Sequence, residues 1–131
     1  MLKLTKKVEY ALISLVHLSD EQGISNSSTK KIADTYSIPL GILAKILQNL
    51  SSLGMIKSVQ GPKGGYQISC NINDMNFFEF IEIIEGPIGI VDCMLSNGCT
   101  SVECCTIKDP MAKINNKIIE TLKNITLDQL R

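Results

Sequence analysis

Three short helical patterns followed directly by a glycine-rich hairpin pattern constrain the fold of this chain more than any other feature. Thr5 is a suitable N-cap for a first helix whose apolar residues recur at helical spacing up to a polar break. A second, shorter pattern starts with Thr29 as cap and ends at the turn Ser37-Ile38-Pro39. A third has Pro39 in its first turn and Gly54 as its stop. Two helices across a tight turn predict a helix-turn-helix.

The third helical pattern has an apolar face and a mixed face. We expect burial of its four leucines at spacings of three or four, Leu40, Leu43, Leu47 and Leu50. The exposed face then carries small and polar residues that suit the base edges of duplex DNA. Lys45 fits a guanine or a phosphate and Gln48 fits an adenine. Solvated surface residues are the alternative for both.

Two strand-like runs, Met55–Val59 and Tyr66–Ser69, enclose the tip Gln60-Gly61-Pro62-Lys63-Gly64-Gly65. Placed after a helix-turn-helix, such a hairpin is typical of a wing. Glycines let the backbone approach phosphates closely, and Lys63 would lie near a groove. An ordinary hairpin turn is the alternative for the tip taken alone. A nucleotide-binding loop is excluded, because the glycine spacing before a Lys-Ser or Lys-Thr pair is absent.

The charge distribution supports a nucleic-acid partner for the first half only. The net charge of the 131 residues is zero, but residues 1–66 carry eight lysines against four acidic side chains, a balance of +4. Phosphate binding depends on such local concentrations of positive charge. We therefore expect residues 1–70 to form a DNA-binding domain. Its candidate contacts are Thr5, Lys6, Lys7, Lys30, Pro39, Leu40, Gly41, Ile42, Lys45, Gln48, Gln60, Gly61, Lys63 and Gly64.

Residues 71–131 read as a second unit with a connecting helix, a loop over 88–106 and a long helix over 109–125. In the connecting helix, Phe77, Ile81 and Ile84 share a face opposite three glutamates, and Gly86-Pro87 ends it. Asp109 as N-cap and Pro110 in the first turn predict the start of the long helix, and Thr126 to Gln129 match a capping box for a last short turn. Its apolar stripe requires a partner, and a second copy of the chain is the preferred one; the stripe consists of Met111, Ile114, Ile118, Leu122 and Ile125.

The loop over 88–106 holds four of the five cysteines. Five residues separate Cys93 from Cys99 and Cys99 from Cys105, so three thiolates could converge on an iron–sulfur cluster or a zinc ion. Redox thiols or buried free cysteines are the alternatives. Cys104 could replace Cys105, while Cys70 is expected to be a small buried hydrophobe.

Neither a signal peptide nor a membrane span is evident, so we expect a cytoplasmic protein in which structural disulfides are disfavoured.

Together these patterns predict a mainly α fold with a small β-hairpin: a winged helix-turn-helix followed by a long C-terminal dimerisation helix. An enzyme is not expected. The chain has one histidine, His17, which we expect to face solvent, and it lacks a nucleophile–base–acid pattern and a nucleotide loop.

With these motifs the sequence resembles the iron–sulfur cluster regulators of IscR and NsrR type. The matching pieces are Leu4-Thr5-Lys6 with Glu9-Tyr10-Ala11-Leu12, the wing from Val59 to Tyr66, and the triad Cys93, Cys99 and Cys105. The stretches Gly86–Cys93 and Cys105–Pro110 look closest to regulators associated with the SUF assembly system. The resemblance implies a homodimer with one two-iron or four-iron cluster per subunit that represses genes of cluster assembly or related stress.

The fourth cluster ligand is a separate question. Family members often use a histidine three residues after the last cysteine, where this chain has Lys108. The resemblance to the NsrR branch implies a different fourth ligand, an acidic residue on the first helix. The matching position in this chain is Glu9. Helical geometry places Glu9 at the edge of the apolar arc, where an unpaired carboxylate is unfavourable. A surface carboxylate leaning outwards is the alternative.

The functional expectation is a DNA-binding regulator whose affinity for a palindromic operator changes with its cluster. Two alternatives stay open. One is a cluster-free repressor that senses thiol oxidation, and the other is a zinc-stabilised interaction module that does not bind DNA.

Overall fold

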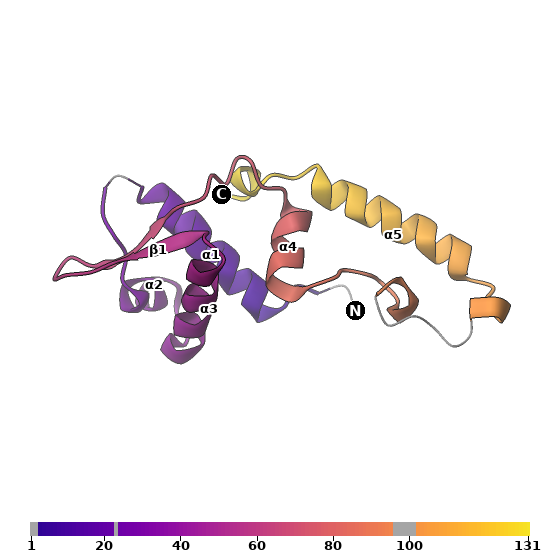
Figure 1. The fold of residues 1–131 in the computed structure, drawn as a ribbon, viewed down its shortest axis with the longest axis horizontal. Coiled ribbons are helices and arrows are strands. Elements are labelled where there is room, and N and C mark those ends of the chain that lie inside the picture. The colour runs from indigo at the N-terminus through magenta and orange to yellow at the C-terminus, as the bar shows by residue number, and fades with distance from the viewer. Residues whose placement is uncertain (1–2, 23, 96–101) are drawn as a thin grey trace.

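The computed structural model describes residues 3–22, 24–95 and 102–131. Its main elements are α1 (Lys6–Asp20), α2 (Thr29–Tyr36), α3 (Leu40–Ser52), β1 (Ile56–Val59), β2 (Gly65–Ile68), α4 (Phe77–Glu85) and α5 (Lys108–Lys123). Short 3-10 turns are η1 (Asp92–Met94), η2 (Val102–Cys104) and η3 (Leu127–Leu130). The molecule is elongated, with the hairpin at one end and α5 leading to the other (Figure 1). The predicted fold class, mainly α with a small hairpin, is confirmed.

The core lies where α1, α2 and α3 pack together. Leu15, Ile32, Leu43 and Leu47 are fully buried there, and burying each such side chain contributes about 1.5–3 kcal/mol. Thr5 caps α1 as predicted, with its hydroxyl accepting a hydrogen bond from the Val8 N–H at 3.3 Å.

The helix-turn-helix forms as predicted, with two local corrections. Ser28, not Thr29, caps α2, because Ser28 has the extended backbone of a cap and its hydroxyl accepts from the Lys31 N–H at 3.1 Å. Pro39 directly precedes α3 and is not inside its first turn.

The prediction that Leu40 is buried is wrong, since its side chain is 53% exposed. The buried stretch of α3 begins one turn later, at Leu43, and Ile46 completes the inner face.

The wing is an antiparallel pair in which Ile56 lies opposite Ile68 and Val59 opposite Gly65. Both isoleucines are buried against the core. Gly54 has a φ of +77° after the end of α3, so it is the stop that its position predicted.

Helix α4 begins with a capping box in which the Asn76 side chain and Glu79 exchange hydrogen bonds with each other's backbone. Its buried face consists of Phe78, Phe80, Ile81 and Ile84. The prediction placed Phe77 on that face, but Phe77 is half-buried. The inner face of α4 is centred on Phe80, which is fully buried.

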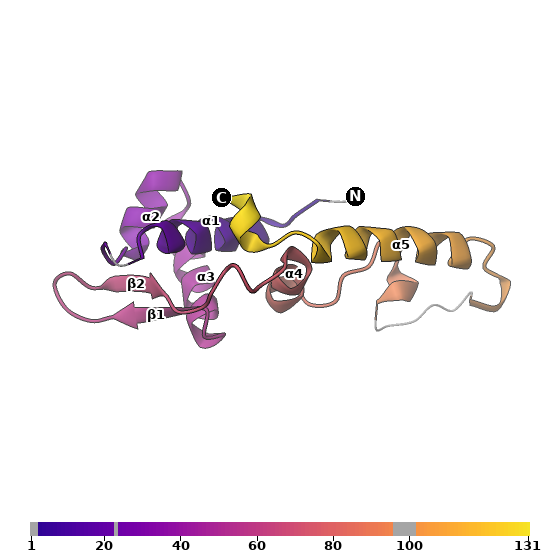
Figure 2. The ribbon, with the colours of Figure 1, turned by 90° about the horizontal axis from the view of Figure 1, so that it is seen from above.

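Helix α5 starts at Lys108 after Ile107, so Asp109 lies in its first turn and is not its cap; Ile125 lies beyond its end. Asn115 is its one buried residue. After α5 the chain returns to the core through η3, where the predicted capping box of Thr126 and Gln129 forms and Leu127 is fully buried. Figure 2 shows α5 extending away from the α1–α3 bundle. Across 3–22, 24–95 and 102–131, no helix has the length and apolarity needed to span a membrane.

Candidate nucleic-acid interface and cysteine segment

The turn between α2 and α3 sets the orientation of the candidate recognition helix. Ser37 adopts a left-handed conformation, with φ of 54° and ψ of 43°, and the Ile38 N–H donates to the Ala33 carbonyl at 3.0 Å. Ile38 itself is buried. The turn is therefore held in place by a backbone hydrogen bond and by the burial of the Ile38 side chain.

On α3, the predicted DNA contacts lie together on the solvent side. The structure leaves Pro39, Leu40, Gly41, Ile42, Lys45 and Gln48 exposed. The helix contains no Asp or Glu, so nothing on it would repel a phosphate backbone. Lys30 is exposed on α2.

The wing tip is held by backbone contacts to the loop before α2. The Asn26 side-chain amide donates to the Lys63 carbonyl at 3.2 Å, and Ser27 and Tyr66 exchange backbone hydrogen bonds of 3.1 and 2.7 Å. Gln60, Gly61 and Lys63 stay exposed, while Gly64 is half-buried. These hydrogen bonds hold the wing against the loop before α2, and the Lys63 side chain at its tip stays exposed to solvent.

The N-terminal turn of α1 is tied to the C-terminal end of α4. The Thr5 hydroxyl donates to a Glu85 carboxylate oxygen at 2.6 Å, and the Lys7 ammonium donates to the Ile84 carbonyl at 2.9 Å. Two predicted DNA contacts thus also serve an internal contact that sequence reasoning missed.

Lys6 and Glu9 form an ion pair on α1, with Nζ 2.6 Å from Oε2. The hydrogen bond and charge of Glu9 raise the pKa of Lys6 above its ordinary value. The Glu9 carboxylate, the candidate fourth cluster ligand, is therefore paired with a lysine in this structure.

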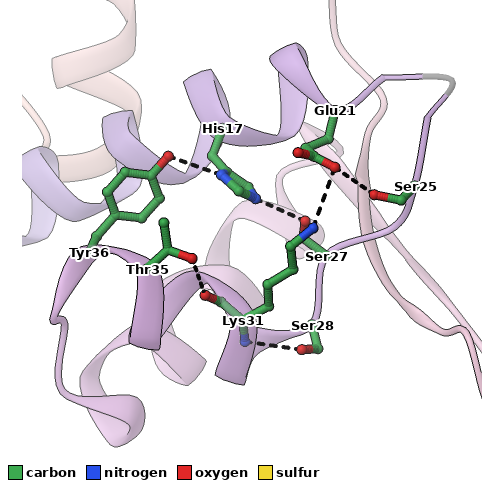
Figure 3. Close-up of polar contacts among 8 residues, drawn as sticks. All are labelled: His17, Glu21, Ser25, Ser27, Ser28, Lys31, Thr35 and Tyr36. Carbon is green, nitrogen blue, oxygen red and sulfur yellow. Dashed lines mark hydrogen bonds and ion pairs between the residues drawn. The ribbon is translucent and has the colours of Figure 1, made fainter.

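His17 was expected to face solvent, and this is wrong. Its ring is buried, with Nδ1 2.9 Å from the Tyr36 hydroxyl and Nε2 2.9 Å from the Ser27 hydroxyl (Figure 3). The loop before α2 folds over the polar face of α1 and covers the ring. Burial lowers the pKa of His17, opposed by Glu21 and Asp20 and reinforced by Lys31. His17 thus joins α1, α2 and the loop that holds the wing.

The cysteine segment, residues 88–106, is attached to α5 in its described first part. The Ile90 N–H donates to the buried Asn115 side-chain oxygen at 3.2 Å, which attaches the chain just before Cys93 to the helix. Cys93, in η1, and Cys105, after η2, are both half-buried, and Cys104 is exposed. Cys99 lies outside the described residues. Within the described ranges no three His, Cys, Asp or Glu side chains gather as a metal site.

Cys70 lies after the wing, away from this segment. It is half-buried, and burial raises the pKa of its thiol. Cys70 packs against the core, but it is only partly buried and not the buried residue that the sequence predicted.

A helix-turn-helix with a basic wing and a long appended helix defines a winged-helix transcription regulator. The profile of the Rrf2 family, described as "Iron-dependent Transcriptional regulator", matches residues 4–131, and this chain belongs to that family. It is a DNA-binding transcriptional regulator and not an enzyme, as the sequence predicted.

Similar proteins carry three different names. The HTH-type transcriptional regulator NsrR of Bacillus subtilis is 30% identical over 131 residues, covering 98% of this chain and 90% of that protein. The structure of CymR, the global cysteine regulator of B. subtilis, superposes with a TM-score of 0.77 at 26% identity, covering 99% and 96% of the two chains. T. potens IscR superposes with a TM-score of 0.75 at 25% identity, covering 98% and 85%.

Proposed function

We propose that this protein is a homodimeric repressor whose operator binding is switched by an iron–sulfur cluster, and that it controls genes of cluster assembly or related stress. The proposal is supported by the family description, by the similarity to NsrR and IscR, and by the cysteine spacing. The contact between the α4 end and the start of α1 is the structural observation that carries it.

In this proposal α3 enters the major groove of the operator and the wing contacts the backbone. Gly41, Lys45 and Gln48 face the bases, and Lys63 faces a phosphate. Lys6 and Lys30 add positive charge near the same surface.

The cluster ligands would be Cys93, Cys99 and Cys105, with Glu9 as the candidate fourth. Half-buried thiols are suitable donors, but the described residues do not bring a full set together. Cluster binding therefore requires the segment over 88–106 to bring Cys93 and Cys105 into one site. It also requires Glu9 to leave its ion pair with Lys6 before its carboxylate can bind the metal. When bound, a cluster supplies a centre that responds to redox state or to small ligands and ties the three thiolates to one point.

A route from the cysteines to the DNA-binding face runs through α4. The segment that carries Cys93 begins where α4 ends. At that end Glu85 accepts from Thr5 and the Ile84 carbonyl accepts from Lys7. Any closure of the cysteine segment that pulls on the end of α4 would therefore move the start of α1, which contacts α3 in the core.

The homodimer is proposed to form through α5. Ile114 is 46% exposed, and the other apolar residues of its stripe within the helix are only half-buried. We expect Ile114→Glu to produce a monomer in sedimentation experiments and to weaken operator binding. Asn116→Glu places the same charge on an exposed position of the same helix and should leave the dimer intact. A dimeric Ile114→Glu protein would contradict this interface.

The cluster is tested by anaerobic purification with visible absorption spectra and iron and sulfide analysis. We expect a coloured protein, and we expect Cys93→Ala, Cys99→Ala and Cys105→Ala each to lose cluster content while Cys70→Ala retains it. Cys104→Ala tests whether Cys104 substitutes for Cys105. If all three substitutions left cluster content and operator affinity unchanged, the mechanism would be wrong.

The similarity to CymR favours a second candidate function, a repressor whose cysteines sense thiol oxidation without a metal. A colourless anaerobic protein whose operator affinity changes on oxidation would support it. Zinc without iron in a protein that does not bind DNA would instead support the interaction module.

A further inference from the structure

The first turn of α3 exposes two large apolar side chains that are separated in sequence by a single glycine. Leu40 is 53% and Ile42 is 49% exposed, and they stand on either side of Gly41. At 100° per residue, Gly41, Lys45 and Gln48 lie near the centre of the exposed face and the two apolar side chains lie on its flanks. The end of the helix that enters the groove in the proposed function is thus apolar on both sides.

Nothing in the fold requires a glycine at position 41. A Cβ built there meets no atom of the described residues within 4 Å, and the φ of Gly41 is not positive. Alanine is the better helix former at such a position. A surface that approaches the helix backbone closely would explain the missing side chain.

The side chains around Gly41 suit a surface that is anionic with apolar spots. Beside Ile42 a depression of about 310 Å³ is lined by Lys7, Ile42, Lys45 and Ile46. Lys45 is exposed beside it, and α3 carries no acidic residue. In the major groove of DNA, phosphates flank the base edges, and the thymine C5-methyl group is an apolar point among polar ones.

We propose that Leu40 and Ile42 read thymine methyl groups in the major groove, with Gly41 allowing the first turn of α3 to reach them. This deepens the proposed function and rests on it, because it requires α3 to enter the groove. Lys45 holds the neighbouring phosphate or guanine. The protein therefore prefers A·T pairs at the base-pair steps that face the first turn of α3.

The test begins with 30-base-pair duplexes that the full-length, anaerobically purified protein selects from a random library. The preferred duplex is then synthesised with deoxyuridine in place of individual thymidines. This removes only the C5-methyl groups and keeps every hydrogen-bonding group of the base edge. At the contacted steps we expect the affinity to fall roughly three- to tenfold per methyl group lost from an apolar contact.

Two variants separate a direct contact between Ile42 and a thymine methyl group from other effects of uracil. They are Ile42→Ala and its matched control Leu53→Ala. Leu53, at the other end of α3, is 44% exposed. Ile42→Ala should bind thymine and uracil duplexes nearly equally, whereas Leu53→Ala should keep the wild-type ratio. Equal affinity of the wild type for both duplexes, or an unchanged ratio in Ile42→Ala and Leu40→Ala, would overturn the methyl readout while leaving operator binding intact. Failure to select any duplex would overturn the proposed function as well.

Discussion

The Nε2 atom of His17 lies 2.9 Å from the Ser27 hydroxyl, and this contact ties the last turn of α1 to the loop that pairs with the wing. On the other side of the ring, Nδ1 meets Tyr36 at the end of α2. Because both neighbours are hydroxyls, a neutral ring satisfies them with one donor and one acceptor. The ring is thus a buried link between three parts of the DNA-binding half.

His17 should make folding stability depend on pH. Burial lowers its pKa below the ordinary 6.5, so the unfolded chain binds its proton first as the pH falls. The contribution is complete above pH 6.5 and is lost as the pH falls from there through the folded pKa. In urea unfolding at fixed protein concentration, His17→Gln should be less stable by about 1–3 kcal/mol at pH 7.5, because the hydroxyl partners lose their geometry.

The same variant provides the control, since glutamine is polar but does not titrate. Between pH 7.5 and 5 its stability should change less than that of the wild type. Glu21, whose pKa is lowered by the Ser25 hydrogen bond and by Lys31, acts only below its ordinary value of 4.5 and outside this range. Parallel curves for the two proteins would contradict the role given to His17.

Gly65 fixes the wing against the loop before α2. It has a φ of +150°, and a Cβ there would lie 2.6 Å from the Ser27 carbonyl. We expect Gly65→Ala to destabilise the fold by roughly 1–3 kcal/mol and to weaken operator binding. For stability, Gly61→Ala is the control, because Gly61 has a φ of +110° but no atom of the described residues within 4 Å of an added Cβ. An equal loss of stability in both variants would show that the close approach is unimportant.

Gly41→Ala should change stability and function in opposite directions. Among the residues that the structure describes, no atom lies within 4 Å of the added methyl group, and alanine favours a helix over glycine by up to about 1 kcal/mol. The midpoint of urea unfolding should therefore rise slightly while operator affinity falls. An alanine variant that binds the operator as well as the wild type would show that α3 does not approach the bases at this point.

Lys63 at the wing tip is expected to contact a phosphate. Lys63→Gln should weaken binding to all duplexes alike and reduce the slope of log affinity against log salt by about one. Lys117→Gln removes the same charge from an exposed position of α5 and should leave the slope unchanged. A change of sequence preference in Lys63→Gln would instead indicate a base contact.

The helix-turn-helix and the wing could be predicted from the sequence because their signals are local. Thr5, Gly54 and the Thr126–Gln129 box act within one turn of the chain, and the structure confirms all three. Family membership was also evident from the sequence, because the matching motifs run over nearly the whole chain.

The errors concern contacts between distant segments and the exact ends of helices. A helical projection places His17 on the polar face of α1, and only the fold brings Ser27 and Tyr36 to its ring. Leu40 fits the apolar spacing of α3, but the packed stretch starts at Leu43. Asp109 precedes a proline, as helix caps often do, yet α5 already includes it. The spacing of the cysteines predicts a metal site, but spacing alone does not place the thiols, and within the described residues no three His, Cys, Asp or Glu side chains gather.

The most direct test of the central claim is the operator affinity of one preparation with and without its cluster, measured anaerobically on the same selected duplex. The account predicts a coloured iron–sulfide protein whose affinity changes at least tenfold when the cluster is removed. It also predicts that Cys93→Ala binds with the affinity of the cluster-free form. A colourless protein, or equal affinities with and without the cluster, would contradict it.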